Sequence, residues 1–217
     1  MFQDFRYVFV RFFLLASMML ASAAVAANQT GARNVLVVGD SLSAAYGIPR
    51  EQGWVALLQQ QLDREMQGFH VINASISGET TSGGLSRMER LLAQHRPRLV
   101  ILELGANDGL RGLPVSDMRR NLAAMIELSQ KSGAKVALIG NMIPPNYGPR
   151  YAQEFRESYA QLARQYELPL VPFLLDGVTE DPDLMQEDGL HPNARAQPLL
   201  LQNVWRALAP WFRRNAA

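Results

Sequence analysis

Ser41 and a distant pair of residues, Asp188 and His191, have the side-chain types needed for acyl transfer. Ser41 follows an apolar run that ends at Gly39, and a serine is a poor nucleophile unless a base accepts its proton. Asp188 and His191 lie three residues apart, so the carboxylate can reach back to the imidazole. We therefore predict that Ser41 attacks an acyl carbonyl, that His191 transfers the proton, and that Asp188 orients His191.

A tetrahedral intermediate also needs hydrogen-bond donors for its negatively charged oxygen. We assign this role to the backbone N–H groups of Ser41 and Gly78 and to the side-chain amide of Asn107. Gly78 has no side chain to obstruct a substrate, and Gly105 and Gly109 allow tight turns on either side of Asn107. Loss of one such donor typically lowers turnover about 100- to 1,000-fold.

Each of these residues also has a purely structural explanation. Ser41 and Ser43 are good caps for a helix after the first apolar run, and Asn107 is a common residue in Asx turns. Asp188 can cap the turn before His191. The catalytic interpretation is favoured because these separate motifs would share one edge of a sheet and together supply every role in a hydrolase.

Other polar residues near these motifs are interpreted as structural. Asp40 and Asp108 are expected to brace their turns by accepting hydrogen bonds from backbone N–H groups. His70 precedes an apolar run and His95 ends a helical pattern, where histidine is easily accommodated. Because the three histidines form no ligand-spaced cluster, we expect no metal site, and no cofactor is expected.

Five apolar runs separated by helical patterns predict a parallel sheet with helices on both faces. The runs span residues 34–38, 69–74, 99–104, 135–140 and 168–172. An open parallel sheet binds ligands outside the carboxyl ends of its strands. Ser41, Gly78 and Asn107 follow the first three runs, and the Asp188/His191 pair follows the fifth. We therefore expect all of them at one edge of the sheet.

Apolar residues at helical spacing predict core-facing helices between the strands. The three stripes are Trp54, Leu57, Leu58, Leu62 and Met66; Met118, Leu122, Met125 and Ile126; and Tyr151, Phe155, Tyr159, Leu162 and Tyr166. A last helix should follow Asn193, a good N-cap, and bury Leu200, Val204 and Leu208. Pro198 removes a hydrogen bond near this start, which predicts a delayed start or a distorted first turn.

The first residues have the pattern of a secretory leader. Arg6 and Arg11 precede an apolar run at 12–20, and small residues follow through Ala27. We expect a signal peptide at 1–26, a single domain at 27–217, and a periplasmic or secreted protein. The apolar stretch is short for a membrane span, and a retained membrane anchor is the alternative.

Composition narrows the class of protein further. Removing the leader takes two of 21 basic residues and one of 20 acidic residues, which leaves 19 of each. This neutral balance, without a Lys/Arg cluster on any predicted helix, disfavours nucleic-acid partners. The absence of cysteine excludes a disulfide framework and a cysteine nucleophile. About 190 residues fit one domain, and we expect a monomer.

At four motifs the chain resembles the SGNH hydrolases, also called GDSL lipolytic enzymes. The matching blocks are residues 39–43, 73–78, 105–108 and 188–193. The likeness is closer to the secreted bacterial thioesterase I/lysophospholipase subgroup, whose loops residues 105–112 and 145–148 resemble. It implies a flavodoxin-like three-layer α/β/α sandwich with a five-stranded parallel sheet, and activity on acyl thioesters, aryl esters and lysophospholipids. It also implies the catalytic and oxyanion-hole roles assigned above.

The sequence therefore predicts an exported serine esterase/thioesterase acting on small acyl ester or thioester substrates. It lacks the Gly-x-Ser-x-Gly elbow of α/β-hydrolases around Ser41, and its first strand does not open into the Gly-x-Gly-x-x-Gly of dinucleotide sites. Aliphatic residues on the loops predict an apolar acyl pocket lined by Leu110, Met142, Ile143, Pro144 and Met185. The alternatives are a carbohydrate O-acetylesterase of the same superfamily and a non-enzymatic exported acyl-chain carrier.

Overall fold

A parallel sheet forms the centre of the computed structural model, which describes residues 33–216. Its strands are β1 (Arg33–Gly39), β2 (Phe69–Asn73), β3 (Leu99–Glu103), β4 (Lys135–Ile139) and β5 (Leu170–Val171). They lie in the order β2-β1-β3-β4-β5, and every neighbouring pair is parallel. This is the flavodoxin-like order, so the predicted fold is confirmed, with strand ends that differ from the apolar runs by a few residues at most.

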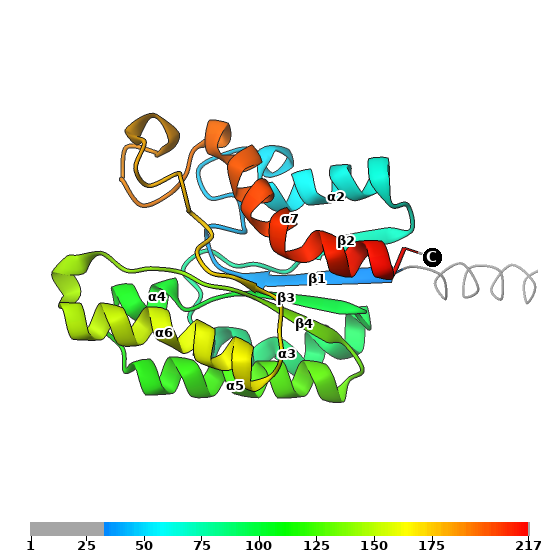
Figure 1. Ribbon diagram of the computed structural model, residues 1–217, viewed down its shortest axis with the longest axis horizontal. Coiled ribbons are helices and arrows are strands. Elements are labelled where there is room, and N and C mark those ends of the chain that lie inside the picture. Colours follow the sequence, from blue (N-terminus) through cyan, green and yellow to red (C-terminus); the bar gives the residue numbers. More distant parts are fainter. Residues whose placement is uncertain (1–32, 217) are drawn as a thin grey trace, which may run out of the picture. The chain divides into compact units, whose positions relative to one another are not determined.

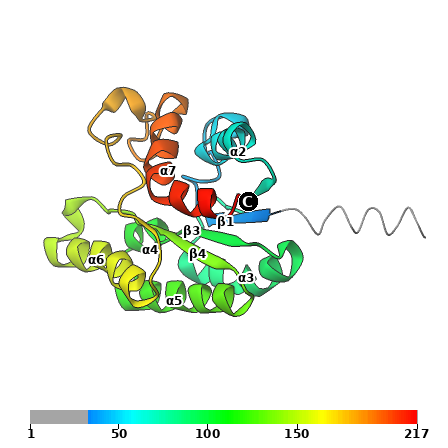
Figure 2. The same cartoon turned by 45° about the vertical axis from the view of Figure 1, so that its right-hand side comes forward.

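Helices cover both faces of the sheet and complete the three layers (Figures 1 and 2). On one face lie α2 (Trp54–Glu65) and α7 (Gln197–Arg214). On the other lie α3 (Thr81–His95), α4 (Ala106–Leu110), α5 (Val115–Lys131) and α6 (Pro149–Gln165). Short 3-10 turns occur at η1 (Arg50–Gln52), η2 (Pro145–Tyr147), η3 (Pro182–Leu184) and η4 (Ala194–Ala196).

The central strands are apolar on both sides because each side meets a layer of helices. Val35 and Val37 of β1 pack into the cluster beneath α2 and α7, whereas Leu36 and Val38 pack into the cluster beneath α3, α5 and α6. Successive side chains of a strand point to opposite faces, so an uninterrupted apolar run fills both cores.

The predicted helical stripes are mostly buried, and the partly buried members are Leu57 of α2 and the two ends of the α6 stripe. Phe155, Tyr159 and Leu162 of α6 are buried in the core. Tyr151 and Tyr166 are only partly buried, and their hydroxyl groups donate hydrogen bonds to the Leu113 carbonyl and the Glu127 carboxylate. The stripe therefore becomes amphipathic where it reaches the surface.

The last helix begins late, as Pro198 predicted. The Asn193 side chain accepts a hydrogen bond from the backbone N–H of Arg195 and caps η4 rather than α7. The α-helix starts at Gln197, with Pro198 in its first turn, where a missing N–H costs little. Leu200, Val204 and Leu208 are fully buried.

The predicted leader at 1–26 and the first residues of the predicted domain lie outside the described residues. Within residues 33–216, none of the helices has the length and apolar character needed to cross a membrane.

Candidate active site

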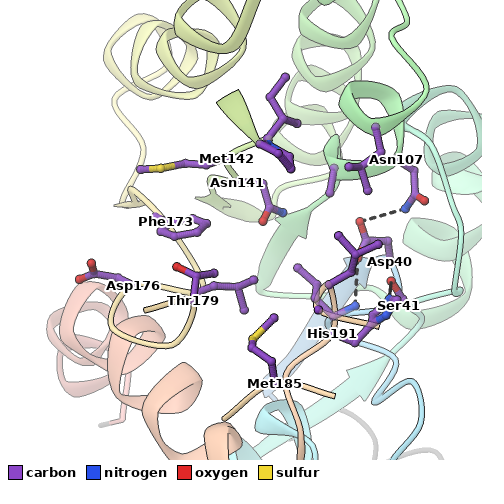
Figure 3. Close-up of a pocket in the computed structure, with 18 of the residues that line it drawn as sticks. Asp40, Ser41, Asn107, Asn141, Met142, Phe173, Asp176, Thr179, Met185 and His191 are labelled. Carbon is purple, nitrogen blue, oxygen red and sulfur yellow. Dashed lines mark hydrogen bonds between the residues drawn. The ribbon is translucent and has the colours of Figure 1, made fainter. Parts of the chain in front are cut away.

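Ser41, His191 and Asp188 meet at the carboxyl edge of the sheet. The Ser41 Oγ lies 2.9 Å from His191 Nε2, and Figure 3 shows the two residues side by side at the cavity. On the other side of the ring, His191 Nδ1 lies 2.6 Å from Asp188 Oδ2. The first pair is separated by 150 positions in the sequence. This is the arrangement of a nucleophile, a base and a carboxylate that orients the base.

The turn after β1 carries Ser41 to this edge. Residues 41–47 form turns rather than a helix, so the helix-cap explanation for Ser41 and Ser43 is wrong. The Ser43 hydroxyl instead donates to Glu103 Oε2 at 2.7 Å. A side chain on Gly39 would place its Cβ 2.8 Å from the same carboxylate oxygen, so the motif needs glycine there for space.

Asp188 both caps its turn and contacts the imidazole. Its Oδ1 accepts hydrogen bonds from the backbone N–H groups of Leu190 and His191, at 2.9 and 3.0 Å. Its Oδ2 is left for the His191 ring, so the structural and catalytic interpretations apply to different oxygens. The backbone and ring hydrogen bonds from His191 lower the pKa of Asp188 to about 2, which keeps the carboxylate ionised near neutral pH.

Two further residues support His191 and were missed by the sequence reasoning. The ring of Tyr46 packs against the imidazole with centroids 4.5 Å apart. The Gln186 side-chain amide donates to the carbonyls of Tyr46 and Pro192, at 2.8 and 3.0 Å. Neither residue belongs to a recognisable motif, because both act through contacts that bring distant loops together.

Asn107 lies in the first turn of α4 and faces the same site. Its Nδ2 donates to Asp40 Oδ2 at 3.2 Å, so the side chain bonds across to the Ser41 turn instead of forming an Asx turn. Gly105 has a φ of +121°, and a Cβ there would lie 2.3 Å from the Tyr159 hydroxyl. Gly109 is a correction: it permits close packing on Ile143 rather than a tight turn.

Gly78 lies on the loop after β2, with a φ of +78° that favours glycine. The Ile76 N–H donates to the Gly39 carbonyl at 3.0 Å, which fixes this loop beside the Ser41 turn. The Arg111 guanidinium donates to the Gly78 carbonyl at 2.8 Å. Gly78 is not among the residues that line the cavity beside Ser41 and His191, so its N–H group stays a predicted donor.

An apolar cavity of about 580 Å³ opens beside Ser41, Asn107 and His191. All five residues predicted for an acyl pocket border it: Leu110, Met142, Ile143, Pro144 and Met185. The sequence reasoning missed the part of the lining that comes from the loop after β5, namely Phe173, Leu175, Asp176, Thr179 and Glu180. The sequence signal that could have found these residues is their position: they follow the carboxyl end of a predicted strand, as the other site residues do.

Residues 37–198 match the GDSL-like Lipase/Acylhydrolase family. The chain belongs to this family. It is 51% identical over 183 residues to the esterase TesA of Pseudomonas aeruginosa, covering 84% of this chain and 91% of that protein. It is 40% identical to the thioesterase 1/protease 1/lysophospholipase L1 of Escherichia coli K12, covering 82% of this chain and 85% of that protein.

A solved structure of a similar protein supports the same fold. The psychrotrophic esterase EstA of a Pseudoalteromonas species, inhibited by monoethylphosphonate, superposes with a TM-score of 0.80 at 46% identity. The match covers 83% of this chain and 99% of EstA. The predicted family, fold and hydrolase class are therefore confirmed.

Behind Ser41 of this GDSL-like protein lie two fully buried carboxyl groups, Asp40 and Glu103. Asp40 braces its turn as predicted, by accepting from the Leu42 N–H at 3.0 Å. Glu103, which the sequence reasoning missed, accepts from Asn141 Nδ2 at 2.8 Å and from the Asp40 N–H at 3.3 Å. Its signal was a lone carboxylate at the end of an otherwise apolar strand.

Asp108 corrects another expectation. It does not brace its own turn but accepts hydrogen bonds from the backbone N–H and hydroxyl of Thr81, at 2.8 and 2.6 Å. It therefore ties α4 to the start of α3. His70 and His95 lie on β2 and at the end of α3, and neither lines the cavity, in keeping with a structural interpretation.

Proposed function

We propose that the protein is an exported serine esterase and thioesterase that works through an acyl-Ser41 intermediate. The observation that carries this proposal is the hydrogen-bonded series Ser41, His191 and Asp188 at the mouth of an apolar cavity. Membership of the acylhydrolase family supports the same chemistry. A non-enzymatic carrier needs no base and no carboxylate to orient one.

In the first half-reaction, Ser41 Oγ bonds to the acyl carbon while His191 Nε2 takes the hydroxyl proton. Asp188 stabilises the imidazolium, and the negative oxygen accepts hydrogen bonds from Asn107 Nδ2 and the proposed backbone donors at Ser41 and Gly78. Collapse breaks the bond to the alcohol or thiol, which receives the proton from His191.

In the second half-reaction, water replaces the alcohol or thiol. His191 takes a proton from this water as its oxygen bonds to the acyl carbon. The second tetrahedral intermediate collapses, the bond to Ser41 Oγ breaks, and the proton returns to that oxygen. The products are a carboxylic acid and the free enzyme, with the proton back on Ser41 Oγ.

The cavity supports aliphatic acyl groups as substrates. Leu110, Met142, Ile143, Pro144 and Met185 would contact the acyl chain, because they border the space next to Ser41. The names of the relatives, an esterase and a thioesterase/lysophospholipase, support esters, thioesters and lysophospholipids. The polar lining residues Asp176, Thr179 and Glu180 come from the loop after β5, so these five aliphatic residues offer the hydroxyl groups of an acetylated sugar no side-chain partner.

Export of the protein is proposed from its N-terminal sequence. It rests on the charged, apolar and small-residue pattern of residues 1–26. N-terminal sequencing of the protein recovered from a periplasmic fraction should begin near residue 27. Recovery of the full chain only from the membrane fraction would favour a retained anchor.

Covalent labelling tests the assignment of the nucleophile. A p-nitrophenyl phosphonate should attach to Ser41, and Ser41→Ala should lower kcat on p-nitrophenyl esters by about 10⁴-fold or more, because the covalent step is lost. Mass spectrometry of the labelled peptide and steady-state rates check both results. A label on another residue, or hydrolysis by Ser41→Ala at the wild-type rate, would overturn the mechanism.

A further inference from the structure

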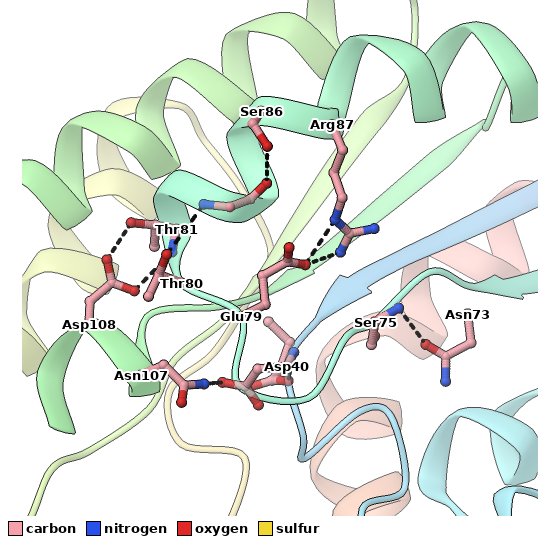
Figure 4. A network of polar contacts seen from close by, with 12 residues as sticks. Asp40, Asn73, Ser75, Glu79, Thr80, Thr81, Ser86, Arg87, Asn107 and Asp108 are labelled. Carbon is pink, nitrogen blue, oxygen red and sulfur yellow. Dashed lines mark hydrogen bonds and ion pairs between the residues drawn. The ribbon is translucent and has the colours of Figure 1, made fainter. Parts of the chain in front are cut away.

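Asp40 precedes the nucleophile in sequence, yet one of its oxygens contacts a different catalytic element. The carboxyl group is fully buried. Its Oδ1 accepts from the Leu42 N–H at 3.0 Å, and its Oδ2 accepts from Asn107 Nδ2 at 3.2 Å (Figure 4). One carboxylate therefore joins the turn that carries Ser41 to the helix that carries Asn107.

This contact decides which way the Asn107 amide faces. An asparagine side chain ends in a donor and an acceptor of nearly equal shape, and only the donor can stabilise a negative oxygen. A carboxylate only accepts hydrogen bonds, so Asp40 selects the orientation in which Asn107 Nδ2, and not Oδ1, faces the Asp40 carboxylate. Nδ2 carries two hydrogens, and the second remains for a ligand in the cavity that Asn107 lines.

Asp40 lies beside a second fully buried carboxyl group, Glu103, whose Oε2 accepts from the Asp40 N–H. Burial and the neighbouring charge of Asp40 raise the pKa of Glu103 well above its usual range, whereas burial raises the pKa of Asp40 to about 6. A pKa of about 6 leaves Asp40 mostly ionised near neutral pH. An ionised acceptor makes the stronger hydrogen bond to an amide donor.

We propose that Asp40 is a positioning residue of the oxyanion hole, which holds the Asn107 amide with one N–H directed at the acyl oxygen. The inference rests on the proposed function of Ser41 and Asn107. Asp40 acts through Asn107 and takes no part in bond making itself.

The substitution Asp40→Asn tests the proposal because it removes one of two acceptors without changing shape. The asparagine can still accept from the Leu42 N–H, but its amide nitrogen would then face Asn107 Nδ2, and two donors cannot bond. Asn107 must rotate or lose its partner. We expect kcat on p-nitrophenyl butyrate to fall about 10- to 100-fold with KM within about twofold, because the donor acts on the transition state.

A double-mutant cycle shows whether the effect passes through Asn107. In the Asn107→Ala background, Asp40→Asn should lower kcat by less than about threefold, because there is no amide left to position. An equal loss in both backgrounds would overturn the proposal, since Asp40 would then act through the charge it presents to His191 or through the turn alone. Ser41→Ala is measured in parallel. If Ser41→Ala hydrolyses the ester at the wild-type rate, the proposed function itself is wrong. If Ser41→Ala is inactive but the losses in kcat from Asp40→Asn and Asn107→Ala are additive, only the role of Asp40 is wrong.

Asp108→Asn is the matched control. Asp108 is a buried carboxylate next to Asn107, but both of its oxygens bond to Thr81. We expect its kcat to stay within about threefold of the wild type, because the Asn107 amide keeps its partner. A loss as large as that of Asp40→Asn would mean that any loosening of α4 has this effect, and would overturn the proposal.

A structure of the wild-type phosphonate adduct tests the geometry without any variant. Asn107 Nδ2 should lie within hydrogen-bond distance, about 3.2 Å or less, of both Asp40 Oδ2 and the phosphonyl oxygen. The proposal is wrong if Nδ2 leaves Asp40 to reach that oxygen, or if the amide presents its carbonyl to the cavity.

Discussion

Individual side chains in this site perform two tasks with separate atoms. Asp188 caps a turn with one oxygen and contacts the ring of His191, the proposed base, with the other. Asp40 divides its oxygens in the same way, between the Leu42 N–H and the Asn107 amide. A carboxylate suits such a position because it offers several acceptor sites in a fixed geometry. At this scale, the structural and catalytic interpretations of a residue are not alternatives.

The buried charge of Asp40 should reduce stability as the pH rises. Burial raises its pKa from 3.8 to about 6, so the folded protein holds this proton more tightly than the unfolded chain. The contribution of Asp40 to the free energy of unfolding is complete below its pKa in the unfolded chain and is lost as the pH rises through about 6. The two limits differ by about 3 kcal/mol in the free energy of unfolding. Urea unfolding of the wild type and Asp40→Asn, from about pH 4 to about pH 7, should show the wild type losing stability relative to the variant. A difference that stays constant with pH would contradict the raised pKa.

Short elements at the carboxyl edge depend on close packing more than on regular secondary structure. The helix α4 has only five residues, yet it presents Asn107 and is held by the Asp108–Thr81 contacts and the Gly105 turn. An isolated helix of this length is not stable in water, so its position comes from its neighbours.

Gly105→Ala should therefore be strongly destabilising. The new Cβ would lie 2.3 Å from the Tyr159 hydroxyl at a φ of +121°, combining a steric clash with backbone strain. We expect a loss of about 3 kcal/mol or more in the free energy of unfolding, measured by urea denaturation. Gly112→Ala is the control, because Gly112 has a φ of +63° but nothing within 4 Å of its Cβ position, and it should cost only about 1 kcal/mol. Equal losses in the two variants would show that the clash is relieved by a small shift.

At the scale of the whole molecule, sheet order brings the site together. With β1 beside β3 in the middle of the sheet, the loops after β1 and β3 are neighbours, and the loop after β5 closes the cavity from the side of β4. Both helical layers are filled by apolar side chains, so the site lies on a rigid base. The proposed catalytic residues lie at one edge of this base, on loops and on the short helix α4.

Acyl chain length should control the rate through this cavity. Each methylene buried against the apolar lining is worth up to about 0.8 kcal/mol. We expect kcat/KM on p-nitrophenyl esters to rise severalfold for each added methylene from the acetate onward, until the cavity is filled. Rates on a series from acetate to palmitate, with acetylated xylan as the comparison, check this expectation. Activity confined to the acetylated sugar would contradict the assignment of an acyl-chain cavity.

The sequence alone determined the apolar strands, the layered fold and the residue types at the four motifs. These are local signals, because an apolar run or a Gly-Asp-Ser turn is recognisable from its own residues. The position of Pro198 in the sequence also predicted the delayed start of α7. Glycines were less well predicted, since Gly109 serves packing and only a neighbour such as Ile143 reveals that.

Only the tertiary structure decided which polar groups touch. The contacts of Asp40 with Asn107, of Glu103 with Asn141 and of Tyr46 with His191 each join segments that are distant in sequence. A lone carboxylate or ring carries no periodic signal, and its partner is set by the order of the strands and the path of each loop. Hydrogen bonds act over about 3 Å, so these relationships exist only once the sheet has placed both partners.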